Sequence, residues 1–229
     1  MAMRGGHGIV VGVNERVQNL DIEVLSDHWY VLRKATFDYL HRDGTRTREV
    51  REAYDRGNGV VILLHDPAAG TVLLTRQFRL PIFLNGHRDG MLIEAAAGLL
   101  DGDDAETAVR REAEEESGVR VGALERLFEL FMSPGSVTER VTFFAATYAH
   151  DQRVSSGGGL IHEGEDIEVL ELTLDDALEM VERGEIVDGK TVLLLQWAAL
   201  RRAASVPNRR DHETLERSDE AAIGLGERL

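Results

Sequence analysis

The chain of 229 residues contains no cysteine. This absence excludes disulfide bonds and thiolate metal sites, and it fits a cytoplasmic protein. The sequence also has no apolar run near the roughly 20 residues that a membrane-spanning helix needs. Its opening, MAMRGGHGIV, is too short and too glycine-rich for a signal peptide. We therefore expect a cytoplasmic location and no membrane partner.

Basic residues are scarce as well. The chain has 26 Lys and Arg against 41 Asp and Glu, which gives a formal net charge of −15. A protein that wraps nucleic acid needs a basic surface, so we expect no nucleic-acid partner. A small anionic substrate stays open, because a local basic pocket or a bound metal can override the net charge. Hydrophobic residues make up 43% of the chain, which is enough for a real core.

The first part of the chain predicts a small antiparallel β-sheet. Strand-like runs cover residues 10–25, 28–39 and 45–54, and the middle run is rich in aromatic and β-branched residues. A module of about 50 residues rarely forms a core alone, so it is expected to pack on the main domain or on a second subunit. We place this module at residues 9–56 and a polar tail at residues 204–229.

Residues 57–203 predict a larger α/β domain. Apolar runs indicate strands at 59–65, 71–78, 91–98, 126–132, 141–148 and 167–174. Helices are expected at 175–183, at 191–202, and between a cap at Asp103 or Asp104 and an end at Gly118. This pattern predicts an α/β/α sandwich around a mixed sheet.

The acidic helix before Gly118 carries carboxylates on its apolar side. Read at about 100° per residue, one face consists of Ala105, Ala108, Val109 and Ala113. Glu112 and Glu116 fall on that same face, Glu115 lies at its edge and Glu114 points away. Buried carboxylates are costly unless a cation is held beside them, and the two also repel each other. A hard divalent cation such as Mg²⁺ would resolve both problems, whereas the alternative is an acidic helix that serves solubility.

The same helix ends in a recognisable motif. Residues 111–119, REAEEESGV, resemble the end of the Nudix box, the signature G-x5-E-x7-R-E-U-x-E-E-x-G-U of the Nudix hydrolases. In the front half, the segment from Gly98 is one residue shorter, and Asp103 or Asp104 stands where the motif has Glu. Ala113 replaces a bulky aliphatic residue.

Further segments over roughly residues 27–196 resemble the bacterial GDP-mannose pyrophosphatase branch of that superfamily. They are YDRGNGVVILLH (54–65), RQFR (76–79), IEAAAGLLD (93–101), LFELFMSPGSVTE (127–139), EDIEVLEL (165–172) and GEIVDGKTVLLLQ (184–196). The related ADP-ribose pyrophosphatases share the SPG element. The resemblance thus implies hydrolysis of a nucleotide sugar with Mg²⁺, or with Mn²⁺ in its place.

The resemblance also implies roles for particular residues. The implied metal ligands are the carbonyl of Ala97 and the carboxylates of Glu112, Glu116 and Glu165. The implied catalytic residues are Glu165 or the competing loop acid Glu163, with Glu115 and Glu116. The implied substrate contacts are Trp29, Arg51, Glu52, Arg79, Glu139 and Lys190. From the residues alone, Arg79 is equally a surface salt-bridge partner, Lys190 a solvent-facing residue, and Trp29 a core or dimer contact.

These inferences lead to one functional hypothesis with two alternatives. The first is an enzyme that splits GDP-mannose into GMP and mannose 1-phosphate. The runner-up is ADP-ribose hydrolysis to AMP and ribose 5-phosphate, and a different class is a Nudix-like protein that binds a nucleotide sugar without cleaving it. The family donates aromatic residues such as Trp29 from a partner subunit, so the resemblance implies a homodimer.

Overall fold

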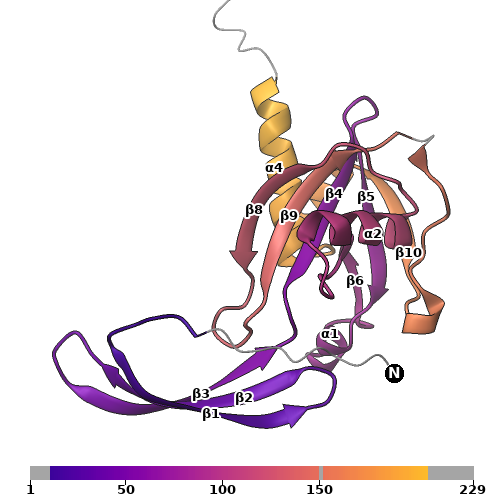
Figure 1. Ribbon diagram of the computed structural model, residues 1–229. Coiled ribbons are helices and arrows are strands. Elements are labelled where there is room, and N and C mark those ends of the chain that lie inside the picture. Colours follow the sequence, from indigo (N-terminus) through magenta and orange to yellow (C-terminus); the bar gives the residue numbers. More distant parts are fainter. Residues whose placement is uncertain (1–10, 150–151, 206–229) are drawn as a thin grey trace, which may run out of the picture.

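The computed structural model describes residues 11–149 and 152–205, which form two sheets (Figure 1). The N-terminal sheet has three antiparallel strands in the order β1-β2-β3. Its strands are β1 (Val17–Asp27), β2 (Val31–Leu40) and β3 (Arg46–Asp55). The predicted small antiparallel sheet is therefore confirmed, while most of the tail at 204–229 lies outside the described residues.

The second sheet is mixed and has seven strands, with β10-β5-β4-β9-β8 as its main path. Its strands are β4 (Gly59–Asp66), β5 (Thr71–Phe78), β6 (Met91–Glu94), β7 (Ala97–Leu99), β8 (Glu125–Phe131), β9 (Arg140–Thr147) and β10 (Glu168–Thr173). Only the β4–β9 pair is parallel among the strand pairs of the described residues.

Two strand predictions were wrong: in the described part of the run 10–25 the strand begins only at Val17, and a second run is not one strand. The run 91–98 was expected to form a single strand, but it divides into β6, which pairs with β5, and β7, which pairs with β4. The break lies at Ala95 and Ala96, two buried alanines. A continuous apolar run does not mark where the chain changes its hydrogen-bonding partner, so the sequence pattern could not show the change from β5 to β4.

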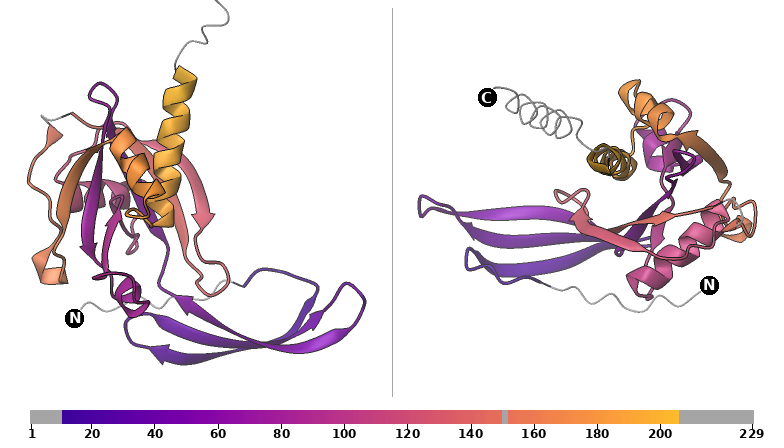
Figure 2. Two further views of the ribbon diagram at one scale, coloured as in Figure 1. Left: turned by 180° about the vertical axis from the view of Figure 1, so that it is seen from behind. Right: turned by 90° about the horizontal axis from the view of Figure 1, so that it is seen from above.

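Helices cover both faces of the large sheet (Figure 2). The helices are α1 (Leu80–Leu84), α2 (Ala105–Ser117), the 3-10 helix η2 (Ile161–Glu163), α3 (Leu174–Glu182) and α4 (Gly189–Ser205). Helix α2 lies on one face of the sheet, and α3 and α4 lie on the other, which confirms the α/β/α sandwich. The sequence did not predict α1, because its five residues, LPIFL, are all apolar and too few to show a helical period. No described helix is both long and apolar enough to cross a bilayer.

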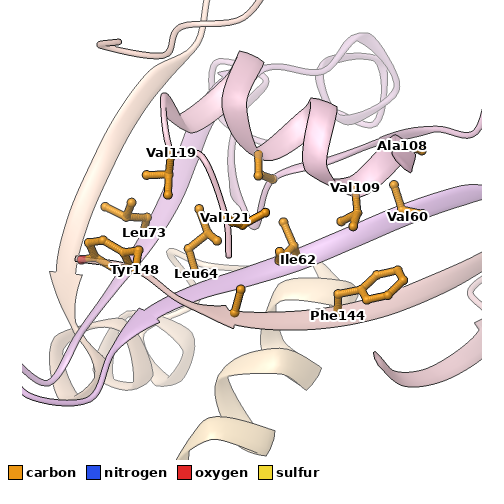
Figure 3. Close-up of a cluster of buried hydrophobic side chains, with 13 residues drawn as sticks. Val60, Ile62, Leu64, Leu73, Ala108, Val109, Val119, Val121, Phe144 and Tyr148 are labelled. Carbon is orange, nitrogen blue, oxygen red and sulfur yellow. The ribbon is translucent and has the colours of Figure 1, made fainter. Parts of the chain in front are cut away.

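The alternating side chains of β4 divide the core into two layers. Ile62 and its neighbours two residues away pack beneath α2, together with Val109 and Phe144 (Figure 3). Val61 and Leu63 point to the opposite face and pack with residues of α3 and α4. Because successive side chains of a strand point to opposite faces, a wholly apolar strand must be covered on both sides. This packing fixes α2 and its carboxylates over the sheet.

Candidate metal and substrate site

The ends of α2 are set by local sequence. Asp104 is the N-cap, and its side chain accepts hydrogen bonds from the backbone N–H groups of Glu106 and Thr107. Gly118 ends the helix in the left-handed conformation, with φ 74°. Of the two capping candidates, Asp104 is thus the one that acts, and the predicted end at Gly118 is confirmed.

The predicted carboxylates of α2 are buried against the sheet. Glu112 is 7% exposed and Glu116 is 2% exposed. The N–H of Ala97 donates to Glu116 Oε2 over 3.1 Å, and Glu112 Oε1 meets Arg111 Nη1 at 2.9 Å. Gly98 allows this approach, because a Cβ at that position would lie 2.1 Å from Cδ of Glu112. The helical wheel therefore placed both carboxylates on the correct face.

Burial makes the charged forms of these two side chains unfavourable. Loss of water raises the pKa of Glu112 to about 7, although the positive charge of Arg111 opposes that rise. Desolvation raises the pKa of Glu116 to about 8, and the negative charges of Glu94 and Glu112 add to it. Two acids held in this state favour any positive charge placed between them.

The donor set fits a hard divalent cation. Ala97 stands opposite Val61 of β4, and the neighbouring Ile62 N–H donates to the carbonyl of Ala96. Val61 and Ala97 are therefore a non-hydrogen-bonded pair of the antiparallel ladder, and the backbone groups of Ala97 do not bond to β4. The N–H of Ala97 is used by Glu116 instead, and its carbonyl also lies outside the ladder. Carboxylate and carbonyl oxygens are the ligands that such cations prefer. The structure does not bring Glu165 together with Glu112 and Glu116 as a third ligand, since among the described residues no group of three His, Cys, Asp or Glu is placed to hold a metal.

The other implied acids have different positions. Glu165 lies close enough to Glu112 for its charge to raise the pKa of that side chain, while its own Oε2 accepts the N–H of Leu160 over 2.7 Å. Glu115 is half-buried at the edge of α2, 3.7 Å from a guanidinium nitrogen of Arg111. The side chain of Glu163 lies outside the described residues.

A residue that sequence reasoning missed connects two of the implied substrate contacts. Glu94, at the end of β6, is 2% exposed. Its Oε1 receives Nε of Arg79 over 2.6 Å, and its Oε2 lies 3.9 Å from Nζ of Lys190. Lys190 also pairs with Asp188 at 2.6 Å. A lone carboxylate inside an apolar strand was the available signal, because a buried acid needs cationic partners.

The remaining implied contacts are not gathered at α2 within one chain. Arg51 pairs with Glu49 of its own strand at 2.7 Å. Glu52 stands opposite Lys34 in the β2–β3 register, and Trp29 is 69% exposed. These residues belong to the N-terminal sheet, which projects from the body away from α2 (Figure 1).

Glu139 lies closer to the buried carboxylates. Its Oε1 is 3.4 Å from Nε of Arg56, and it would also lie 3.4 Å from a Cβ built on Gly59. The same Cβ would stand 3.0 Å from the carbonyl oxygen of Gly98, so Glu139 borders the strand β7 that supports the α2 site.

Comparison with known proteins identifies the family. A NUDIX domain model matches residues 55–195, and a model described as the GDP-mannose pyrophosphatase NudK N-terminal domain matches residues 16–54. The chain therefore belongs to the Nudix family, whose members generally use a divalent metal.

Within that family, the chain is similar to enzymes of one kind. It is 54% identical to a GDP-mannose pyrophosphatase of Pectobacterium atrosepticum over 78% of this chain and 92% of that one. Proteins of the same name from Yersinia pestis and Yersinia enterocolitica are 51% and 50% identical over 81% of this chain and 92% and 96% of theirs. The expected resemblance is confirmed.

Proposed function

We propose that the protein hydrolyses the pyrophosphate bond of GDP-mannose, giving GMP and mannose 1-phosphate, with Mg²⁺ as its metal and Mn²⁺ as a substitute. The observation that carries the proposal is the pair of buried carboxylates, Glu112 and Glu116. The charge of Arg79 acts on Glu116, and Glu94, whose charge also acts on Glu116, pairs with both Arg79 and Lys190. Buried acids next to cations suit a substrate that combines a metal with a diphosphate. The similarity to GDP-mannose pyrophosphatases supports the choice of sugar nucleotide.

The metal ligands in this proposal are Glu112, Glu116, Glu165 and the carbonyl of Ala97. A divalent cation bound there supplies neutralisation of the diphosphate charge and activation of water. Glu116 is oriented for this by the N–H of Ala97. Glu112 is oriented by Arg111, which also donates from Nη2 to the carbonyl of Leu99 over 3.2 Å.

The substrate phosphates are bound by cations that Glu94 holds in place. Arg79 and Lys190 approach different oxygens of this carboxylate, so both are kept close to Glu94, whose charge also acts on Glu116. Arg79 remains about one-third exposed and can reach a ligand. Their positive charge offsets the negative charge that develops as the bond between the phosphates breaks.

A loop carboxylate acts as the general base in this proposal. Glu165 is the first candidate because its charge reaches Glu112. Glu163 is the competing candidate, and Glu115 lies beside the metal ligands. The base takes a proton from the attacking water, which bonds to phosphorus, and the leaving phosphate carries away the electron pair of the broken bond.

We further propose a cytoplasmic homodimer, with residues 9–56 as the dimerisation module, 57–203 as the hydrolase domain and 204–229 as a polar tail. The N-terminal sheet supports this because it exposes apolar side chains without a layer of its own to cover them. They are Leu20, Val24, Leu25, Trp29 and Val50. Trp29, Arg51 and Glu52 then reach the site of the partner subunit and contact its nucleotide.

A substrate panel tests the proposed activity. GDP-mannose, ADP-ribose and other nucleotide sugars are assayed with Mg²⁺ or Mn²⁺, with products separated by chromatography. The expected result is the highest kcat/KM for GDP-mannose and no turnover after chelation. A far higher kcat/KM for ADP-ribose would favour the runner-up, and binding without turnover of any substrate would favour a non-catalytic Nudix protein.

A further inference from the structure

The glycine-rich loop after β9 is hydrogen-bonded to the C-terminal end of α2. The N–H groups of Gly158 and Gly159 donate to the carbonyls of Glu116 and Glu115, each over 3.0 Å. Val154 N–H donates to the carbonyl of Gly118 over 2.8 Å. The last carbonyls of a helix have no partner within the helix, so this loop supplies the donors that α2 lacks.

Close approach of the two backbones depends on glycine. Gly157 has φ 67°, and a Cβ there would lie 2.4 Å from the carbonyl oxygen of Glu116. Gly118 has φ 74°, and a Cβ there would lie 2.3 Å from the carbonyl oxygen of Ser155. Real Cβ atoms essentially never come so near to backbone, and neither partner is a side chain that could rotate away. Alanine at either position must push the loop off the helix.

The docked loop also carries Glu165. Two adjacent amides of the loop make these contacts. Gly159 N–H donates to the backbone carbonyl of Glu115 in the helix, and Leu160 N–H donates to Glu165 Oε2 over 2.7 Å. Gly158 closes the loop, because its carbonyl accepts the N–H of Ile167 over 3.2 Å. The carboxylate of Glu165 is therefore connected to the end of α2 through two consecutive peptide groups.

We propose that Gly157 and Gly118 are positioning residues that dock the Glu165 loop onto the metal-binding helix. Their lack of a side chain lets the loop amides reach the α2 carbonyls, and this contact holds the Glu165 carboxylate, bound to the N–H of Leu160, at the end of α2. The catalytic part of the inference rests on the proposed function, since it takes Glu165 as the general base. The docking itself does not depend on that role.

The test compares Gly157→Ala with Gly164→Ala. Both glycines lie in the left-handed region, at φ 67° and 83°, so an alanine is strained at either position. A Cβ at Gly164 meets nothing within 4 Å, although this residue is next to Glu165. The pair thus separates loss of docking from backbone strain. Gly118→Ala disrupts the same contact from the side of the helix, so it replaces Gly157→Ala as the test variant if Gly157→Ala does not fold.

Amide hydrogen exchange gives a readout that is independent of activity. In Gly157→Ala, exchange at Gly158 and Gly159 is expected to be about tenfold faster or more, as for a locally opened segment, while Gly164→Ala keeps wild-type protection. Unchanged protection in folded Gly157→Ala and Gly118→Ala would overturn the docking. If the wild type hydrolysed no nucleotide sugar, the proposed function would fall, and exchange would still decide whether the loop docks.

Kinetics then test whether docking acts through Glu165. Gly157→Ala should lower kcat about tenfold or more with little change in KM, up to the limit of about 10²–10⁴ that complete loss of a general base would give. In a Glu165→Gln background, Gly157→Ala should lower kcat no further, because the group that it positions is already absent. An equal loss in both backgrounds, or lost protection with wild-type kcat, would overturn the positioning role.

Discussion

The two sheets of this protein differ in what holds them together. The large sheet is covered by helices on both faces, and β4 alone buries six consecutive residues. The N-terminal sheet has strands of ten or eleven residues, yet Arg33 is its only buried residue within β1–β3. One sheet is stabilised by side-chain packing, and the other chiefly by its backbone ladder. A β-sheet without a covered face is marginally stable in water, so the N-terminal sheet depends on its neighbours.

The junction between the sheets is correspondingly polar. Asp55 accepts from Nη1 of Arg33 over 2.6 Å and from Oγ1 of Thr138 over 3.1 Å. The backbone of Tyr54 accepts from Thr138 and donates to Ser136. These bonds attach β3 to the segment before β9, which is the segment that carries Glu139. The buried carboxylates thus lie in the well-packed body, whereas the N-terminal sheet, which we propose contacts a partner subunit, is joined to it by a few polar bonds.

The largest expected effect lies in the body, at the carboxylates that we propose as metal ligands. Glu116→Gln keeps the shape but removes the charge, so we expect kcat to fall by about 10²–10³-fold or more, as when a group that stabilises transition-state charge is lost. Steady-state assays with GDP-mannose measure this, and circular dichroism checks the fold. The control is Glu114→Gln, since Glu114 pairs with Arg120 on the outer side of α2. Wild-type turnover in Glu116→Gln would contradict the metal assignment.

The same Val→Ala change in each sheet tests the comparison directly. Val61 is fully buried in β4, so Val61→Ala should lower the free energy of unfolding by about 2–4 kcal/mol, because methyl groups are lost and a cavity remains. Val50 in β3 is 52% exposed, so Val50→Ala should change the free energy of unfolding of the dilute monomer by less than about 0.5 kcal/mol. Urea denaturation measures both. Equal costs would mean that the N-terminal sheet is packed in solution as tightly as the body.

A smaller effect is expected from pH. Burial raises the pKa of Glu112 to about 7 and of Glu116 to about 8, above their ordinary 4.5. The unfolded chain therefore releases these protons at lower pH than the folded one. The contribution of these two groups to the free energy of unfolding is therefore fully present below pH 4.5, and it is lost as the pH rises through their pKa values in the folded protein.

Thermal unfolding of chelated protein measures this dependence. Between pH 5 and pH 8 the free energy of unfolding should fall by an amount on the order of 1 kcal/mol or more. Glu116→Gln should weaken the fall, and added Mg²⁺ should oppose it most at the higher pH. A flat profile in the wild type would argue that these carboxylates are hydrated in solution.

The smallest effect is expected at Trp29. Trp29→Ala should raise KM by about three- to tenfold and weaken the proposed dimer, as loss of an aromatic interface contact does, while kcat and monomer stability stay near wild type. Sedimentation velocity and steady-state kinetics give the two readouts. A wild-type protein that sediments as a monomer at all concentrations would exclude donation of Trp29 across subunits.

Much of the fold was predictable because its signals are local. The apolar runs marked β4 and β5 nearly to the residue, and the helical period put Glu112 and Glu116 on the buried face. The exchange of partners within 91–98 was not predictable, since pairing is a contact between distant segments. Glu94 was missed for a related reason: its importance comes from Arg79 and Lys190, which approach it from other parts of the chain.

The sequence by itself determined the mixed sheet, the acidic helix with its capped ends and the pair of inward carboxylates, because periodicity and capping act within a few residues. Only the tertiary structure decided that Ala97 meets Glu116, that Glu94 joins two cations, and that the glycine-rich loop docks on the end of α2. Each of these contacts joins segments far apart in the chain. Their geometry follows from packing across the sheet, which a linear pattern does not encode.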